Sequence, residues 1–268
     1  MAVKEGKQTF SSIENALRIL KAFSMDSPEL RVTDLAEELN LAKSTVHRLL
    51  TTMAGEGFVF KDPRSSAYSL GVSVLSLTNI VHSQLHILED ATPLLNMLTE
   101  KTGESSHIAI LEGNEVIYLQ KIESEYASQI TTHIGRRNPV HCTGSGQAIL
   151  AFEKEEVIEQ LLSEPLQRFT ENTITATDKL QQRLHEVKQL GYVVNREEFE
   201  EKIIAIGAPI FNEKEEVIAS VNITGPVVRL EQRVKQQQSI AEVVHTAKRI
   251  TELIKLRKRN AYIQRKPY

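Results

Sequence analysis

The sequence has little cysteine, with Cys142 as the single one among 268 residues. It cannot form an internal disulfide, and this scarcity is typical of proteins that work in a reducing cytosol. Long apolar runs are missing too, since none reaches the roughly 18 to 20 residues needed to cross a bilayer. The first ten residues also lack the apolar stretch of a secretory signal peptide. These absences predict a cytoplasmic protein with no membrane partner.

The sequence has no excess of positive charge, because its formal net charge is −3. The whole chain therefore shows no sign of binding nucleic acid, although a DNA-binding protein needs only a local basic face. Hydrophobic residues make up 41% and charged residues 25% of the chain, which excludes a disordered or fibrous protein. The length predicts two domains.

Residues 1–70 predict three helices followed by a β-hairpin. The first helix is expected to begin after Ser11, with Glu14 placed to complete a capping box. The second is expected to begin at an N-cap Thr33 and to end at Asn40, which tolerates the left-handed conformation of a sharp turn. The third has apolar residues at i, i+3, i+4 and i+7, and the alternation of residues 58–70 predicts the hairpin.

One short window meets the demands of a helix-turn-helix, with the small Ala36 where the helices cross and Asn40 at the turn. We therefore predict a winged helix-turn-helix that binds double-stranded operator DNA, with the third helix in the major groove. Two other interpretations remain open: a polar face that is merely solvated, and a protein-interaction module. The predicted DNA-binding residues are short hydroxyl-bearing and basic side chains of the third helix and hairpin: Lys43, Ser44, Thr45, His47, Arg48, Thr51, Lys61 and Arg64.

Residues 71–88 predict a linker helix, and residues 89–257 predict a second domain. A helix over residues 90–102 is expected to hold Pro93 in its first turn. The domain is predicted to be α+β, with a mainly antiparallel sheet flanked by helices. A basic tail, residues 258–268, is interpreted as following a solvated helix end. Strands are expected at 106–111, 116–122, 128–133, 191–196, 203–211 and 217–224, and helices at 146–152, 153–162, 178–190 and 231–256.

Eight motifs follow one another along the chain: Ser12–Leu20, Thr33–Leu39, Lys43–Leu50, Gly57–Phe58, Gly135–Ala148, Gly191–Phe199, Ala208–Phe211 and Val221–Pro226. In this order they resemble the IclR family of bacterial transcription regulators, and the resemblance covers nearly the whole chain. It implies a winged helix-turn-helix, a linker helix and a C-terminal effector-binding domain related to GAF-like sensors. It also implies homodimers or dimers of dimers on palindromic operators, with small organic acids or aromatic or sugar-derived metabolites as effectors.

The resemblance also implies which residues line the effector pocket. This sequence departs from relatives that have Asp at 195, Cys at 205 and Ser at 222 and 224, which leaves the identity of the ligand open. The implied pocket residues are Ala127, Ile130, Asn138, Gly144, Ser145, Asn195, Ile203, Ala205, Asn222 and Thr224.

The residues themselves favour an anionic ligand in this domain. Glycines at the start of the helix after Thr143 expose backbone N–H groups, and a helix N-terminus favours a negative charge. The alternative is a plain helix cap filled by water. Asn222 and Thr224 alternate along one strand and point to one face, where with Asn195 they could bind a ligand or form ordinary satisfied packing. We predict a regulator of a metabolic operon that responds to a carboxylate-bearing metabolite.

Two other function classes are alternatives to this regulator: a GAF-like enzyme and a protein-interaction adaptor. A thiol nucleophile would need a partner for Cys142, but the neighbouring His141 points to the opposite side of an extended segment. The spacing of His107 and His133 relative to these two residues resembles no metal-ligand motif. We therefore expect no enzymatic activity, no cofactor and no metal.

Overall fold

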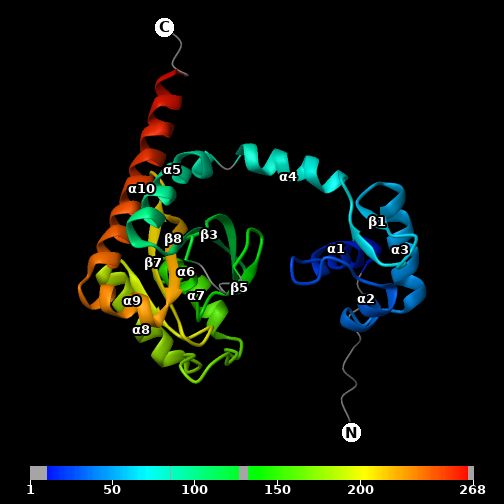
Figure 1. The fold of residues 1–268 in the computed structure, drawn as a ribbon, viewed down its shortest axis with the longest axis horizontal. Coiled ribbons are helices and arrows are strands. Elements are labelled where there is room, and N and C mark those ends of the chain that lie inside the picture. The colour runs from blue at the N-terminus through cyan, green and yellow to red at the C-terminus, as the bar shows by residue number, and fades with distance from the viewer. Residues whose placement is uncertain (1–10, 85, 127–131, 265–268) are drawn as a thin grey trace. The chain divides into compact units, whose positions relative to one another are not determined.

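The computed structural model describes residues 11–84, 86–126 and 132–264 (Figure 1). The chain divides into two units, Met1–Leu85 and His86–Tyr268. The second unit begins at His86 rather than at residue 89, because its first helix begins there. No helix among the described residues combines the length and apolar character that crossing a bilayer requires.

The N-terminal unit is a three-helix domain with a hairpin and one further helix. Its core is a cluster that includes Ile19, Leu35, Val46 and Leu50. The apolar face predicted for the third helix is confirmed, since the buried residues of that helix repeat at the predicted spacing. On the first helix the core side chain is Ile19, whereas Ile13 and Leu17 are exposed. Asn40 has a φ of 53°, as the sharp turn requires. The elements are α1 (Ser12–Ala22), α2 (Val32–Glu38), α3 (Lys43–Gly55), β1 (Val59–Lys61), β2 (Tyr68–Leu70) and α4 (Ser73–Gln84).

The two helix starts show one correct prediction and one wrong one. The capping box between Ser11 and Glu14 is confirmed by reciprocal bonds of 2.6 and 3.2 Å. The prediction of Thr33 as N-cap is wrong, since α2 begins at Val32 after the N-cap Arg31. The Asp34 carboxylate accepts the Arg31 N–H at 2.9 Å, so the third residue of the helix caps its start instead.

Helix α5 (His86–Thr102) begins earlier than predicted, so Pro93 lies inside the helix and not in its first turn. The buried residues Leu88, Ala91 and Leu95 continue one helical face across the proline. Burial of that face maintains the helix although Pro93 lacks a backbone N–H to donate.

A six-stranded antiparallel sheet forms the centre of the C-terminal unit, in the order β5-β4-β3-β8-β7-β6. This confirms the predicted α+β class. The edge strand β5 was not predicted from the sequence. Of the strand predicted at 128–133, residues 128–131 lie outside the described residues, and Thr132 and His133 are not in a strand. The strands are β3 (Ser105–Glu112), β4 (Glu115–Ile122), β5 (Arg137–Pro139), β6 (Val193–Arg196), β7 (Ile203–Phe211) and β8 (Val217–Pro226).

Helices cover both faces of this sheet (Figure 1), and the two faces differ in chemistry. One face packs Ile108, Val221 and Ile206 against α5 and α10 (Gln238–Gln264) in an apolar core. The other face is covered by α6 (Gly144–Leu150), with α7 (Glu155–Leu162) and α8 (Thr177–Leu190) beside it. On that second face β3 and β8 carry several polar side chains, which places the candidate site there.

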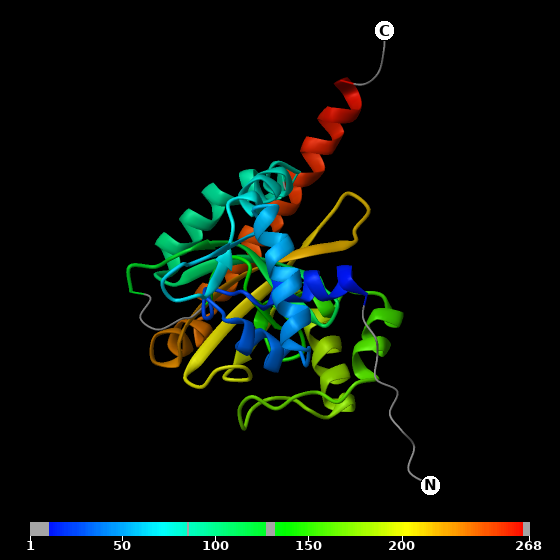
Figure 2. The same ribbon diagram turned by 90° about the vertical axis from the view of Figure 1, so that its right-hand side faces the viewer.

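The prediction of a single long final helix over residues 231–256 is wrong. The chain forms α9 (Val227–Lys235) and then α10, separated at Gln237, whose φ of 57° cannot continue a helix. Helix α10 extends to Gln264, so residues 258–264 are helical and not a tail. The turn between β7 and β8 projects beyond the sheet (Figure 2), and its Glu215 pairs with Lys255 of α10 at 2.5 Å.

Candidate functional site

The exposed face of α3 carries most of the predicted DNA-binding residues. Lys43, Ser44, His47, Arg48 and Thr51 are exposed, whereas Thr45 is half-buried. No acidic residue occurs between residues 40 and 55, so this face is locally basic although the chain as a whole is not. Such a face can contact both phosphates and base edges.

The start of α3 is suited to a phosphate. Its N-cap Ala42 has no side chain that could accept the first N–H groups, and Lys43 follows directly. An uncapped helix N-terminus attracts an anion because its N–H groups and the helix dipole point outwards. The Thr51 hydroxyl donates to the His47 carbonyl at 2.8 Å, so it can offer a ligand only its acceptor oxygen.

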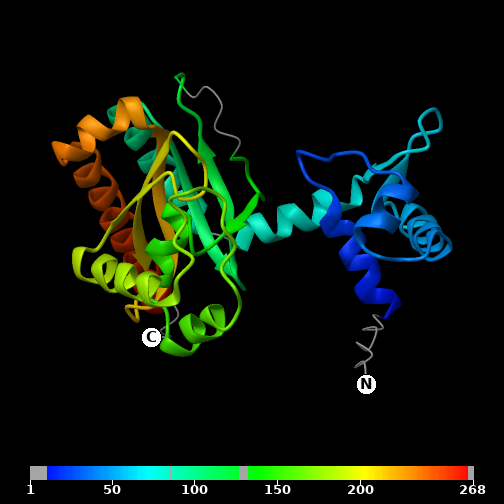
Figure 3. The same ribbon diagram turned by 90° about the horizontal axis from the view of Figure 1, so that it is seen from below.

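The β1–β2 hairpin projects from the helices of the N-terminal unit (Figure 3). Lys61 and Arg64 are exposed on it, and the Asp62 carboxylate shapes its tip by accepting the Arg64 N–H at 2.7 Å. At the base of the hairpin Gly71 lies against Gly57, where a Cβ atom on Gly71 would come within 2.0 Å of the Gly57 carbonyl oxygen. This close contact fixes where the hairpin leaves the helices.

A small cavity opens between α6 and the polar face of the sheet in the C-terminal unit, with a volume of about 40 Å³. Its walls include seven of the ten predicted pocket residues. Ser145 is fully buried near the Tyr118 hydroxyl and is not in the wall, and Ala127 and Ile130 lie outside the described residues. The wall residues are Tyr118, Thr132, Asn138, Thr143, Gly144, Asn195, Phe199, Glu200, Ile203, Ala205, Asn222 and Thr224.

Tyr118, Thr132, Thr143, Phe199 and Glu200 were therefore missed by the sequence analysis. Burial raises the pKa of Glu200, and the nearby positive charge of Arg136 partly offsets this. Burial also raises the pKa of Tyr118, which keeps the phenol neutral. Except for Glu200, the wall is built from uncharged side chains.

The glycines at the start of α6 have a different role from the one predicted. The N–H of Gly146 is not open to a ligand, because the Thr143 hydroxyl accepts it at 3.2 Å. A Cβ on Gly146 would come within 2.1 Å of the Val140 carbonyl oxygen, so this glycine allows close packing. Gly144 does line the cavity, and its N–H has no acceptor within the helix.

Three buried side chains on the sheet form a polar stripe behind the cavity: His107, Ser220 and Asn222. Each is at most 1% exposed. His107 and Asn222 are paired across β3 and β8, so their side chains share one face. The rings of His107 and Tyr118 pack edge to face, with 5.5 Å between their centroids. Both ring nitrogens of His107, the Ser220 hydroxyl and the Asn222 carbonyl oxygen have no hydrogen-bond partner among the described residues. Buried polar atoms of this kind destabilise a fold unless something binds them.

Burial lowers the pKa of His107 to about 3, with a smaller contribution from the charge of Lys121. In the unfolded chain this histidine becomes protonated below about pH 6.5. In the folded protein it stays neutral until the pH falls to about 3. The folded state should therefore lose stability as the pH falls through this window, by about 1.4 kcal/mol per pH unit from this group.

We expect His107→Leu to remove that part of the pH dependence. Urea unfolding followed by tyrosine fluorescence at pH 7 and pH 5 should show the wild type losing about 2 kcal/mol more than the variant. Equal losses in the two proteins would mean that His107 is not kept neutral by burial.

A second buried network holds the start of α6 against the segment after β6. Gln147 donates to Glu198 at 2.6 Å and to the His141 carbonyl at 2.7 Å, and Asn195 donates to the Cys142 carbonyl at 3.2 Å. Burial raises the pKa of Cys142 to about 12, so its thiol is not a reactive nucleophile. No three histidine, cysteine or carboxylate side chains gather as a metal site in the part of the chain that the structure describes.

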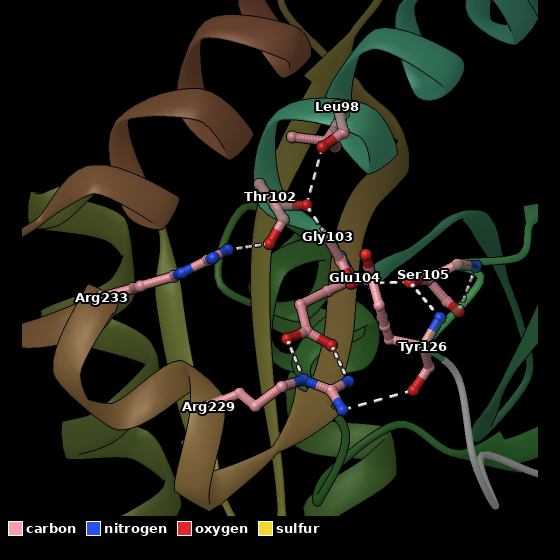
Figure 4. A network of polar contacts seen from close by, with 9 residues as sticks. Leu98, Thr102, Gly103, Glu104, Ser105, Tyr126, Arg229 and Arg233 are labelled. Atoms are coloured by element: carbon pink, nitrogen blue, oxygen red, sulfur yellow. Dashed lines mark hydrogen bonds and ion pairs between the residues drawn. The ribbon is translucent and has the colours of Figure 1, made fainter.

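A polar clamp fastens the segment that leads towards Ala127 (Figure 4). Glu104 is 1% exposed and accepts two bonds from Arg229, at 2.9 and 2.6 Å. Arg229 also donates to the Tyr126 carbonyl at 3.3 Å, and Ser124 donates to the Gly103 carbonyl at 2.6 Å. The Glu104–Arg229 clamp thus joins α9, the start of β3 and the chain before residue 127.

Each of the two units matches the model of a known protein family. The family model of the IclR helix-turn-helix domain matches residues 12–69, and that of the bacterial transcriptional regulator IclR C-terminal domain matches residues 79–252. XynR of Escherichia coli K12, an HTH-type transcriptional regulator, is 32% identical over 80% of this chain and 85% of its own. KdgR of the same strain, also an HTH-type regulator, is 32% identical over 89% and 90%.

A solved structure of an IclR homologue from Microbacterium hydrocarbonoxydans, in complex with 4-hydroxybenzoate, has a TM-score of 0.79 and 26% identity, covering 91% of this chain and 99% of its own. The chain belongs to the IclR family of DNA-binding bacterial transcriptional regulators and carries the family's C-terminal effector domain.

Proposed function

We propose that this protein regulates a metabolic operon and that a small carboxylate-bearing metabolite, bound in the cavity beneath α6, controls its affinity for operator DNA. The main supporting observation is the polar wall of the cavity, to which Asn138, Asn222 and Thr224 contribute. The homologue in complex with 4-hydroxybenzoate supports a small organic acid as ligand. The N–H of Gly144 in the wall suits its carboxylate.

We propose that the protein binds DNA as a homodimer or a dimer of dimers. Exposed apolar side chains on α1, Ile13 and Leu17, and on α4, Leu75 and Val81, would be buried in such an assembly. Two α3 helices would then enter successive major grooves about 34 Å apart. The proposed contacts to each half-site come from α3 and from Lys61 and Arg64 of the hairpin.

The size of the cavity bears on how the effector would act. A volume of about 40 Å³ holds little more than one water molecule, whereas ligand pockets commonly measure about 300–1,000 Å³. An organic acid would have to displace wall side chains such as Phe199 or Glu200. The effector would therefore favour a conformation with a larger cavity, and this differential affinity is what a ligand needs to shift an equilibrium.

Replacing Asn222 with leucine should abolish the response to the effector while the protein still binds its operator. The measurement is fluorescence anisotropy of a promoter fragment from beside its own gene, with carboxylic acids added one at a time, beginning with 4-hydroxybenzoate. We expect the acid that changes wild-type operator affinity to lose at least about tenfold of its potency on the variant, the cost of about one lost hydrogen bond to the ligand.

Asn172→Leu is the matched control, because it makes the same substitution at an exposed residue in a loop. Its response should equal that of the wild type. An Asn222→Leu variant that keeps the full response would remove Asn222 from the effector site.

A further inference from the structure

The polar stripe of His107, Ser220 and Asn222 lies deeper than the cavity. Asn222 belongs to both, since it lines the cavity and is paired with His107 on the neighbouring strand. Tyr118 also lines the cavity, and its ring touches His107. Two residues of the cavity wall are thus direct neighbours of His107.

The stripe lacks bonding partners that a similar buried pair on the opposite face possesses. Thr99 and Ser106 lie between α5 and the sheet, where their hydroxyls bond to each other at 2.8 Å and Ser106 also donates to the Leu95 carbonyl at 3.1 Å. His107, adjacent to Ser106 in sequence but on the other face, has neither ring nitrogen bonded among the described residues. The Thr99–Ser106 pair therefore has its hydrogen bonds within the fold, whereas the atoms of the stripe do not.

The unpaired atoms indicate what kind of ligand group would fit. A neutral imidazole has one donor and one acceptor, a hydroxyl has both, and the Asn222 carbonyl oxygen is an acceptor. A carboxylate would supply acceptors only and would leave the Asn222 oxygen unpaired. A hydroxyl group, which both donates and accepts, matches the mixed set.

We infer that the stripe is a second compartment of the effector site, in which His107 and Asn222 bind a hydroxyl group of the effector. This inference rests on the proposed function, and it makes the effector a hydroxylated organic acid. A hydroxyl of the bound acid reaches past Tyr118 to the stripe.

The ligand test uses two pairs of acids that differ only in hydroxyl groups: 4-hydroxybenzoate with benzoate, and D-gluconate with hexanoate. Thermal unfolding of the full chain is measured with each acid at millimolar concentration. We expect at least one hydroxylated acid to raise the melting temperature and to bind about tenfold or more tightly than its partner, and His107→Leu to erase that difference. Equal binding within both pairs, or no stabilisation by either hydroxylated acid, would overturn the inference.

A second measurement needs no ligand. Because an unpaired buried polar group destabilises the fold, replacing it with an apolar side chain of similar volume should leave the melting temperature unchanged or raise it. His107→Leu should behave in this way, whereas the control Thr99→Val, which breaks a bond that is made, should lower the melting temperature. If His107→Leu lowers it as much as Thr99→Val does, the histidine has a structural role and the inference fails.

The two proposals fail separately. An operator complex that responds to an acid, but with no contribution from its hydroxyl or from His107, would sustain the proposed function and contradict the second compartment. A protein that binds no operator would contradict the proposed function, whatever acid it binds.

Discussion

Replacing Arg48 with alanine is expected to weaken operator binding by at least about 30-fold. Arg48 is exposed on α3. It belongs to the locally basic face, because no acidic residue occurs between residues 40 and 55. An arginine that reads a base edge contributes about 1–3 kcal/mol, and a dimer would lose two such contacts. The measurement is anisotropy of a labelled promoter fragment against a random fragment, at several salt concentrations.

Arg249→Ala is the control, because it removes the same charge from α10 in the other unit, where Arg249 lies 3.9 Å from Glu252. It should change operator affinity little. The salt dependence separates two roles for Arg48: loss of a phosphate contact weakens binding to both fragments and lowers the salt slope, whereas loss of a base contact removes the preference for the operator. Unchanged operator affinity would mean that α3 presents another face to DNA.

Arg229→Leu is expected to lower the stability of the C-terminal unit by about 2–3 kcal/mol. The variant leaves the Glu104 carboxylate, 1% exposed, without the guanidinium that binds both its oxygens. The loss should fall at the lower end of the range for buried pairs, because the Arg229 side chain is 36% exposed and partly screened by solvent. Urea unfolding of the full chain measures it.

Two further variants test the cause. Adding Glu104→Gln to Arg229→Leu should recover part of the stability, because the neutral amide leaves no uncompensated charge. Arg196→Leu breaks the exposed pair with Glu231 of α9, 3.1 Å apart, and should cost less than about 1 kcal/mol. A loss from Arg229→Leu no larger than that from Arg196→Leu would show that the clamp contributes little.

The sequence predicted elements whose signals are local. The strands predicted at 203–211 and 217–224 match β7 and most of β8, because the residue preferences of a strand are set by neighbouring residues. Asn40 was identified at the helix turn for the same reason. The break at Gln237 and the short edge strand β5 were missed, since tertiary packing determines both.

Residues of the candidate site that belong to a family motif were predicted, whereas residues whose role depends on burial in the fold were missed. Asn138, Asn195 and Asn222 were identified through resemblance, and the structure brings all three to one cavity. Glu200 lies in a run of acidic residues that reads as solvated surface, and His107 lies in an apolar strand. Nothing in the sequence around His107 distinguishes a paired histidine from an unpaired one, because its partners would come from β8, more than a hundred residues away.

The regulatory function is tested most directly by measuring binding of the full chain to fragments from around its own gene, by anisotropy over a salt series, with and without hydroxylated organic acids. We expect saturable binding to one promoter fragment, far tighter than to random DNA, strongly weakened by salt and altered by one of the acids. Weak and equal binding to every fragment, unchanged by any acid, would contradict a ligand-controlled regulator.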